Sequence, residues 1–175
     1  MAIMKKNSLK NASIQFKVFL ILSVLYAVLI FYFSSISSSD AESISGFLDI
    51  EFIRNIFRYL SSSDFNFLLS PFYIFYKQPD KLVHLILYAG FGILLCYTLK
   101  NSPNSTLHKH ALLFAIIIGT VYGASDEFHQ SFVPGRTASL WDLAADSTGV
   151  IMAQAVIFIK DKFCIRNRIF SISTK

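Results

Sequence analysis

Four apolar stretches, each near the length that a helix needs to cross a lipid bilayer, restrict the folds open to this chain. They cover residues 18–36, 82–99, 111–128 and 140–159. A hydrocarbon layer of about 30 Å takes roughly 20 helical residues, and backbone polar groups inside it must be hydrogen-bonded within the segment. We therefore predict an all-α integral membrane protein, a bundle of four transmembrane helices.

The composition agrees with a lipid environment. Of the 175 residues, 54% are hydrophobic and 15% are charged, whereas soluble domains carry about 25% charged residues. The net charge of +5 does not indicate a nucleic-acid partner, because the chain has no basic helix or basic-aromatic module and basic residues of membrane proteins mark sidedness first. Cys96 lies within an apolar run and Cys164 in a basic tail, so we expect no disulfide between them.

The first apolar run has a basic flank and could be read as a cleaved signal peptide. Its apolar stretch is longer than the ~7–15 residues of a typical signal core, and no clear A-x-A site follows it. We favour an uncleaved membrane anchor.

Basic residues predict the orientation of the bundle. If both termini are cytoplasmic, the inner segments hold eleven of the sixteen Lys and Arg residues: Lys5, Lys6, Lys10, Lys17, Lys100, Lys109, Lys160, Lys162, Arg166, Arg168 and Lys175. The outer segments hold the other five: Arg54, Arg58, Lys77, Lys81 and Arg136. By the positive-inside rule, we expect residues 1–17 and 160–175 to be basic cytoplasmic ends of a multi-pass membrane protein.

The long outer segment, residues 37–79, has two parts. In the first, Ile44, Phe47, Leu48, Phe52, Ile53, Ile56, Phe57 and Leu60 recur at steps of three and four with polar residues between them. This spacing predicts an amphipathic helix in the outer interface. The second part, Phe65 to Tyr76, is dense in aromatics and is expected to lie at headgroup depth as an interfacial lid. Both parts could also serve only as packing over the bundle.

Polar residues gather at the predicted outer ends of the last three spans. The candidate pocket comprises Asp80, Lys81, His84, Tyr88, Asp126, Glu127, His129, Gln130, Arg136, Asp142 and Asp146. Small residues at four-residue steps, Ala111 to Gly123 on the third span and Ala145 to Ala153 on the fourth, predict that these two helices pack along a shared seam. Extending both stripes outward leads to the carboxylates, so we expect them to meet in a wet or paired polar pocket.

Several of these residues also have structural explanations. Asp142 follows Ser139 at capping-box spacing, and Asp80 suits a helix N-terminus. Lys81 could anchor the interface, His84 could be a packing residue, and Glu127 could be solvated at its helix end. Pro134 and Gly135 suit the centre of a type II turn in the loop that carries Arg136.

Two blocks give the chain a resemblance to the VanZ-like family of small bacterial membrane proteins. They are DKLVHLILYAGFGILL, Asp80 to Leu95, and GASDEFHQSFVPGRTASLWDLAADSTGV, Gly123 to Val150. The resemblance implies a VanZ-like core over residues 80–159 and a location in a bacterial cytoplasmic membrane. It also implies, through the founding member, a link to resistance against the glycopeptide antibiotic teicoplanin, without an agreed catalytic residue. Asp146 stands where the family usually has Asn.

Three functions remain open from the sequence. The first is an envelope protein whose pocket binds an amphiphile, either a lipid-linked cell-wall intermediate or a lipoglycopeptide. The second is an intramembrane metal-assisted hydrolase or transferase. His and carboxylates are suitable divalent-metal ligands, but no His-Glu-x-x-His occurs, and Ser125 and Ser139 lack a nucleophile elbow. The third, a small transporter, has little support because no inverted repeat is visible. We expect membrane lipids as partners and no organic cofactor, and we leave a divalent metal and the oligomeric state open.

Overall fold

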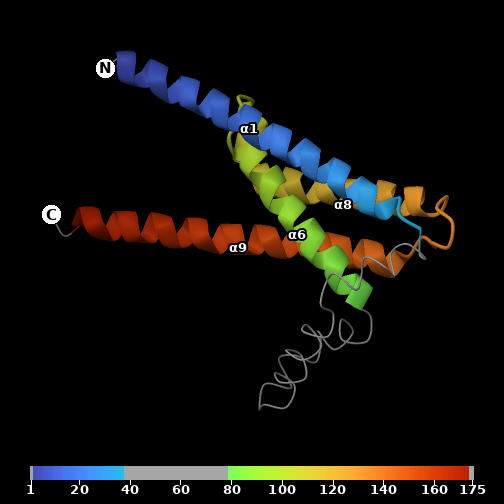
Figure 1. Ribbon diagram of the computed structural model, residues 1–175. Helices are drawn as coiled ribbons and strands as arrows, with labels where there is room; N and C mark the ends of the chain where they lie inside the picture. The colour runs from blue at the N-terminus through green and yellow to red at the C-terminus, as the bar shows by residue number, and fades with distance from the viewer. Residues whose placement is uncertain (1, 38–78, 174–175) are drawn as a thin grey trace, which may run out of the picture.

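The computed structural model describes residues 2–37 and 79–173 of the chain, and this part is helical. Its elements, labelled as in Figure 1, are α1 (Ala2–Ser34), α6 (Pro79–Lys100), α7 (Ser105–Lys109), α8 (Ala111–Gln130) and α9 (Leu140–Ser173). Four of them are long and apolar enough to cross a membrane, over Ser13–Ser34, Lys81–Lys100, Ala111–Gln130 and Leu140–Cys164. The predicted four-helix membrane fold is confirmed. The amphipathic helix and the aromatic lid predicted within residues 37–79 lie outside the described residues.

The first and last helices extend well beyond the apolar runs. α1 begins at Ala2 and α9 continues to Ser173, because neither polar flank contains Pro or Gly to break the helix. α6 begins at Pro79, where the fixed φ of proline favours a first helical turn. Asn104 caps α7 by accepting hydrogen bonds from the backbone N–H groups of Thr106 and Leu107.

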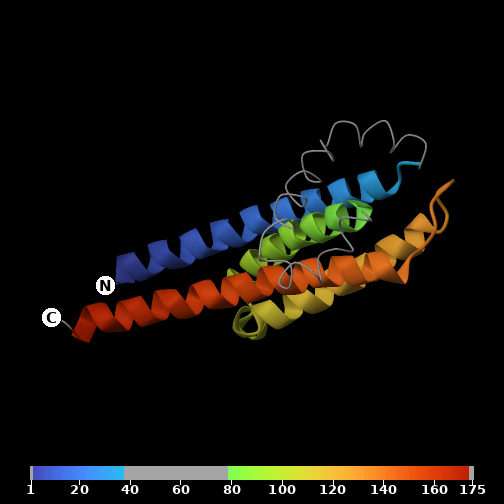
Figure 2. The ribbon, with the colours of Figure 1, turned by 90° about the horizontal axis from the view of Figure 1, so that it is seen from below.

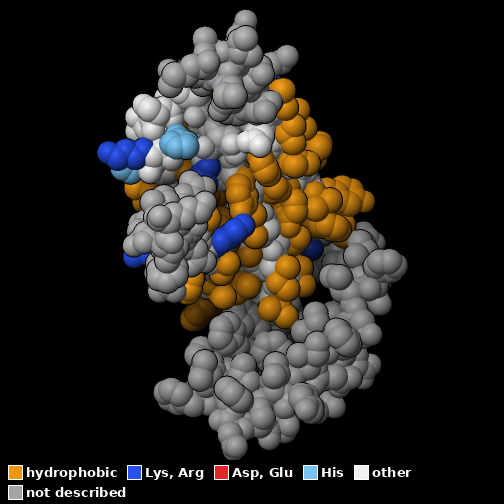
Figure 3. Space-filling model, turned by 90° about the vertical axis from the view of Figure 1, so that its left-hand side faces the viewer, with side chains coloured by type: hydrophobic (Ala, Val, Ile, Leu, Met, Phe, Trp, Pro, Cys, Tyr) orange, Lys and Arg blue, Asp and Glu red, His pale blue; other side chains and the backbone are white. Residues whose placement is uncertain are grey.

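The bundle is centred on α6, which contacts α1, α8 and α9. Figures 1 and 2 show α1 and α9 on either side of α6, with both termini at one end of the bundle and the α8–α9 connection at the other. We call the latter the loop end. Figure 3 looks onto the opposite end, where Lys, Arg and His side chains are visible among apolar ones and no acidic side chain of the described residues is seen.

The two small-residue stripes pack against different partners. On α8, a Cβ added to Gly119 would lie 2.8 Å from Val150 Cγ2, and one added to Gly123 would lie 3.2 Å from Asp146 Oδ2, so this stripe faces α9 as predicted. On α9, a Cβ added to Gly149 would lie 2.2 Å from the backbone oxygen of Leu85. The α9 stripe therefore meets α6 instead, and the prediction that it meets the α8 stripe is wrong. Residues one position apart point about 100° apart on a helix, so Gly149 faces α6, while Val150 lies between Gly119 of α8 and Gly92 of α6, whose added Cβ would be 3.3 Å from Val150 Cγ1.

Over Ser13–Ser34, most side chains of α1 face outward, and a few polar bonds hold the helix to the bundle. Large apolar side chains such as Ile21, Leu25 and Val28 are exposed, as expected for a helix surrounded by lipid. The buried hydroxyl of Ser23 hydrogen-bonds the hydroxyl of Thr98 on α6 at 2.9 Å. The hydroxyl of Tyr122 on α8 donates to the carbonyl oxygen of Ala27 at 2.7 Å.

The α8–α9 connection, at the loop end of the bundle, contains a tight turn. The backbone N–H of Arg136 donates to the carbonyl oxygen of Val133 at 3.1 Å, and Gly135 has a φ of 74°. A positive φ at the third position of a turn is the mark of type II and favours glycine. The turn expected at Pro134 and Gly135 is confirmed.

Candidate polar site at the loop end

Nine of the eleven predicted pocket residues have side chains that the structure places in or beside one polar cluster at the loop end. This loop-end cluster comprises Lys81, His84 and Tyr88 of α6, Asp126, Glu127 and Gln130 of α8, Arg136 of the connection, and Asp142 and Asp146 of α9. All are buried except Lys81, His84 and Arg136, which are half-buried. The side chain of Asp80, in the first turn of α6, lies outside the described part.

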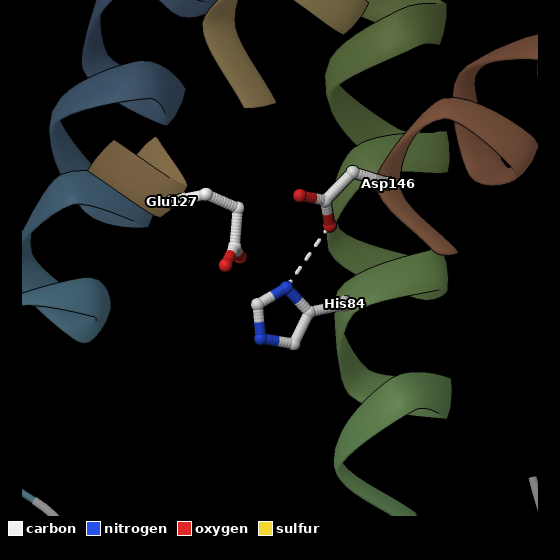
Figure 4. A group of neighbouring side chains, drawn as sticks. All are labelled: His84, Glu127 and Asp146. Carbon is white, nitrogen blue, oxygen red and sulfur yellow. Dashed lines mark hydrogen bonds and ion pairs between the residues drawn. The ribbon is translucent and has the colours of Figure 1, made fainter. Parts of the chain in front are cut away.

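The centre of the cluster is a trio of His84, Glu127 and Asp146, one from each of three helices (Figure 4). Their potential ligand atoms all lie within 4.8 Å of one another. His84 Nδ1 and Asp146 Oδ1 form a hydrogen bond of 3.0 Å, and Figure 4 shows the Glu127 carboxylate pointing toward the same imidazole. Asp146 is fully buried. Its oxygen Oδ2 and the Glu127 oxygen Oε1 make no hydrogen bond with the described residues.

The other oxygen of Glu127 completes a helix cap. Glu127 Oε2 accepts a hydrogen bond from the backbone N–H of Ser139 at 2.7 Å, while the Ser139 hydroxyl accepts one from the backbone N–H of Asp142 at 3.4 Å. In an ordinary capping box the acidic residue three positions on would bond the cap N–H. Here that acceptor comes from α8, and the Asp142 carboxylate is instead paired with Lys81 of α6.

A cavity of about 80 Å³ adjoins the trio between α1, α6 and α8. Its polar lining includes His84, Tyr88, Asp126, Gln130, Arg136 and Ser34, and its apolar lining is Ile30, Phe33, Val83 and Leu87. The Tyr88 hydroxyl and Asp126 Oδ1 are buried and make no hydrogen bond with the described residues. Such groups are normally satisfied by water or a ligand. His84 belongs to both the cavity and the trio, so it joins the two.

Arg136 and His129 both contact the end of α1. Arg136 donates from Nε to the carbonyl oxygen of Ile36 at 3.1 Å and from Nη2 to that of Phe33 at 3.4 Å. His129 stacks on Phe31 with ring centroids 4.4 Å apart and hydrogen-bonds the Ser35 hydroxyl through Nε2 at 3.0 Å. His129 therefore lies away from the trio, whereas Arg136 lines the cavity while holding α1.

Sequence reasoning missed what α1 contributes. Ser34 is buried, lines the cavity and has a hydroxyl without a partner among the described residues. The signal lay in the spacing. Among the side chains of α1 that the structure describes, residues 13–34, the buried ones are Ser23, Ile30 and Ser34. They recur at steps of seven and four, the period of one helix face.

The charges of the loop-end cluster do not balance. Asp126, Glu127, Asp142 and Asp146 are all buried, and only Lys81 and Arg136 bring permanent positive charge among the described members. Two negative charges are left over if every carboxylate is ionised and His84 is neutral. Uncompensated buried charge is costly in a protein interior or a membrane. The cluster is therefore suited to holding cationic or hydrogen-bond-donating groups.

The fold and the cluster define a multi-pass membrane protein with an acidic site at one end of its bundle. The family model VanZ/LLP1 matches residues 19–161, and the chain belongs to this family. The resemblance stated from the two sequence blocks is thus confirmed. Comparison with curated proteins and with solved structures gave no match.

Proposed function

We propose that the loop end faces the outside of a bacterial cytoplasmic membrane and binds the polar head of an amphiphilic envelope molecule. The candidate ligands are a lipid-linked cell-wall intermediate and a lipoglycopeptide antibiotic such as teicoplanin. The orientation is supported by the basic residues at the terminal end of the bundle, the end that the positive-inside rule assigns to the cytoplasm.

The observation that carries the proposal is the mixed lining of the cavity. Asp126, Gln130 and Arg136 offer acceptors and donors, and Ile30 and Phe33 of α1 offer apolar surface. A molecule with a polar head and a hydrocarbon tail matches such a lining, because its tail can lie along the exposed apolar side chains of α1 while its head meets the polar groups of the cavity.

The excess of carboxylates in the loop-end cluster indicates which chemical groups the polar head of the ligand should carry. Carboxylates accept hydrogen bonds from hydroxyl, amide and ammonium groups, all of which lipid-linked sugar-peptides and glycopeptides carry. Arg136 uses two of its donors on the carbonyl oxygens of Phe33 and Ile36 and keeps others for a phosphate or carboxylate. A cavity of about 80 Å³ holds only a few water-sized groups, so it takes one functional group of the head.

The test is binding by the intact protein in lipid nanodiscs. Teicoplanin and a lipid-linked cell-wall intermediate are titrated separately, and complexes are counted by native mass spectrometry. We expect a saturable one-to-one complex with at least one of them, weakened by Asp126→Asn and unchanged by Asp161→Asn, a matched change in the Lys100–Asp161 pair at the terminal end. Equal binding by wild type and Asp126→Asn, or no saturable complex, would remove the proposal.

A further inference from the structure

We infer that His84, Glu127 and Asp146 form a binding site for one divalent transition-metal ion, such as Zn²⁺ or Mn²⁺. One imidazole and two carboxylates are ligands that both ions accept. The inference goes beyond the proposed function, since the site can bind an ion with no amphiphile present.

The first step is convergence. The three side chains come from α6, α8 and α9, and their potential ligand atoms lie within 4.8 Å of one another. Figure 4 shows the Glu127 carboxylate and the Asp146 carboxylate on either side of the His84 ring. A metal ion about 2.0–2.2 Å from each ligand atom brings those atoms within about 4 Å of one another, so small side-chain movements would close the trio around an ion.

The second step concerns the oxygens that have no partner. Asp146 is fully buried and Glu127 is only 6% exposed. Even so, Asp146 Oδ2 and Glu127 Oε1 make no hydrogen bond with the described residues. Leaving a buried acceptor unsatisfied is costly, more so for a charged group. A cation between the two carboxylates would satisfy both oxygens and offset the two excess negative charges of the loop-end cluster.

The third step is how the ligands are held. Glu127 is fixed through Oε2 by the backbone N–H of Ser139 at 2.7 Å, which leaves Oε1 free. Asp146 Oδ1 and His84 Nδ1 already share a hydrogen bond of 3.0 Å, so an ion bound by both residues would take the place of the proton between them. Anchoring ligands through a second hydrogen bond is how proteins orient metal-binding carboxylates and imidazoles. Three protein ligands leave a further position for water or for a ligand oxygen reaching in from the cavity beside His84.

The test is metal binding by the full-length protein in detergent. Wild type is stripped with EDTA, freed of chelator, and titrated calorimetrically with ZnCl₂ and with MnCl₂. The exposed His108 and His110 at the opposite end are changed to Gln throughout, so that they cannot add a weak site. We expect one ion per chain, with binding weakened by roughly 100-fold or more in His84→Gln, Glu127→Gln and Asp146→Asn.

Two matched controls distinguish metal coordination by the trio from attraction of the ion to negative charge elsewhere in the protein. Asp126→Asn removes a buried carboxylate of the same cluster that is outside the trio, and Asp161→Asn removes one at the other end. Asp161→Asn should bind within about fivefold of wild type, because its charge is exposed and lies at the other end of the bundle. Asp126→Asn should lose clearly less affinity than the trio variants, because it removes a nearby charge and no ligand. Failure of wild type to bind either ion stoichiometrically, or an equal loss in Asp126→Asn and Asp146→Asn, overturns the inference. Should Asp146→Asn fail to fold, His84→Gln gives the same reading. Because no amphiphile is present, a negative result leaves the proposed ligand binding untouched.

Discussion

Glu127, at the end of α8, caps the N-terminus of α9 by accepting the backbone N–H of Ser139 at 2.7 Å. The two helices that carry the buried carboxylates are therefore joined by a polar bond as well as by packing. The bond also sets the direction of the second Glu127 oxygen, which belongs to the trio with His84 and Asp146.

Replacing Glu127 should separate its capping role from its charge. In Glu127→Ala the Ser139 N–H loses its acceptor, and we expect the free energy of unfolding to fall by about 1–2 kcal/mol, the usual cost of a lost cap. In Glu127→Gln the amide oxygen can still accept that N–H, so stability should stay near wild type. Thermal unfolding in detergent measures both. Ser125→Ala, at an exposed position of the same helix, is the control, and equal melting of all variants would contradict the capping role.

The glycine positions predict a graded series of stability losses. Gly149→Ala should be severe, because the added Cβ would lie 2.2 Å from the backbone oxygen of Leu85 and a backbone cannot easily move away. Gly119→Ala should be milder, because its Cβ would meet the Val150 side chain at 2.8 Å and cores absorb such overpacking at roughly 1–3 kcal/mol.

The yield of monodisperse protein and its melting temperature test this order. Ala144→Leu, on the exposed face of α9, should leave both unchanged. If Gly119→Ala proves more damaging than Gly149→Ala, the tightest approach in the bundle lies between α8 and α9 and not between α6 and α9.

The sequence was sufficient for the helices and for the end at which polar groups gather, because span length and depth of polar residues are local properties of the chain. It was not sufficient to predict which helices and side chains contact one another. Which face of α9 meets α6 depends on how α6 crosses the bundle, and the spacing of Ala145, Gly149 and Ala153 is the same whichever helix lies against it. Likewise, the spacing of Ser139 and Asp142 predicts a capping box, and only the fold reveals that Glu127 accepts the Ser139 N–H in place of Asp142, whose carboxylate pairs with Lys81.

The proposed orientation predicts which loops are reachable from outside the cell. In a Cys164→Ser background, where the remaining Cys96 is fully buried, single cysteines are placed at the exposed positions Thr137 and Ser105. An impermeant maleimide added to whole cells should label Thr137→Cys strongly and Ser105→Cys only after lysis, because the positive-inside rule places the α6–α8 connection in the cytoplasm. The reverse pattern would turn the loop-end cluster toward the cytoplasm and exclude an external ligand.

The last prediction separates recognition from scaffolding at the cavity. Asp126 and Arg136 both line it, but Arg136 also holds the carbonyl oxygens of Phe33 and Ile36 at the end of α1. We expect Asp126→Asn to weaken ligand binding by about tenfold or more, since a hydrogen bond to a charged group contributes about 1.5–3 kcal/mol, with little change in melting temperature. Arg136→Lys should also weaken binding, because an ammonium cannot reproduce the planar fork of a guanidinium. It should keep most of the stability, because it still offers a donor to one α1 carbonyl. Arg136→Ala should lower stability as well as binding, because α1 then loses both bonds.

Binding to the nanodisc-embedded protein and melting in detergent are measured for all three variants. If Arg136→Lys loses stability and binding in parallel, Arg136 is a clamp for α1 alone. If Asp126→Asn and Arg136→Lys both bind as wild type does, the cavity is part of the scaffold and the ligand must be sought elsewhere on the protein.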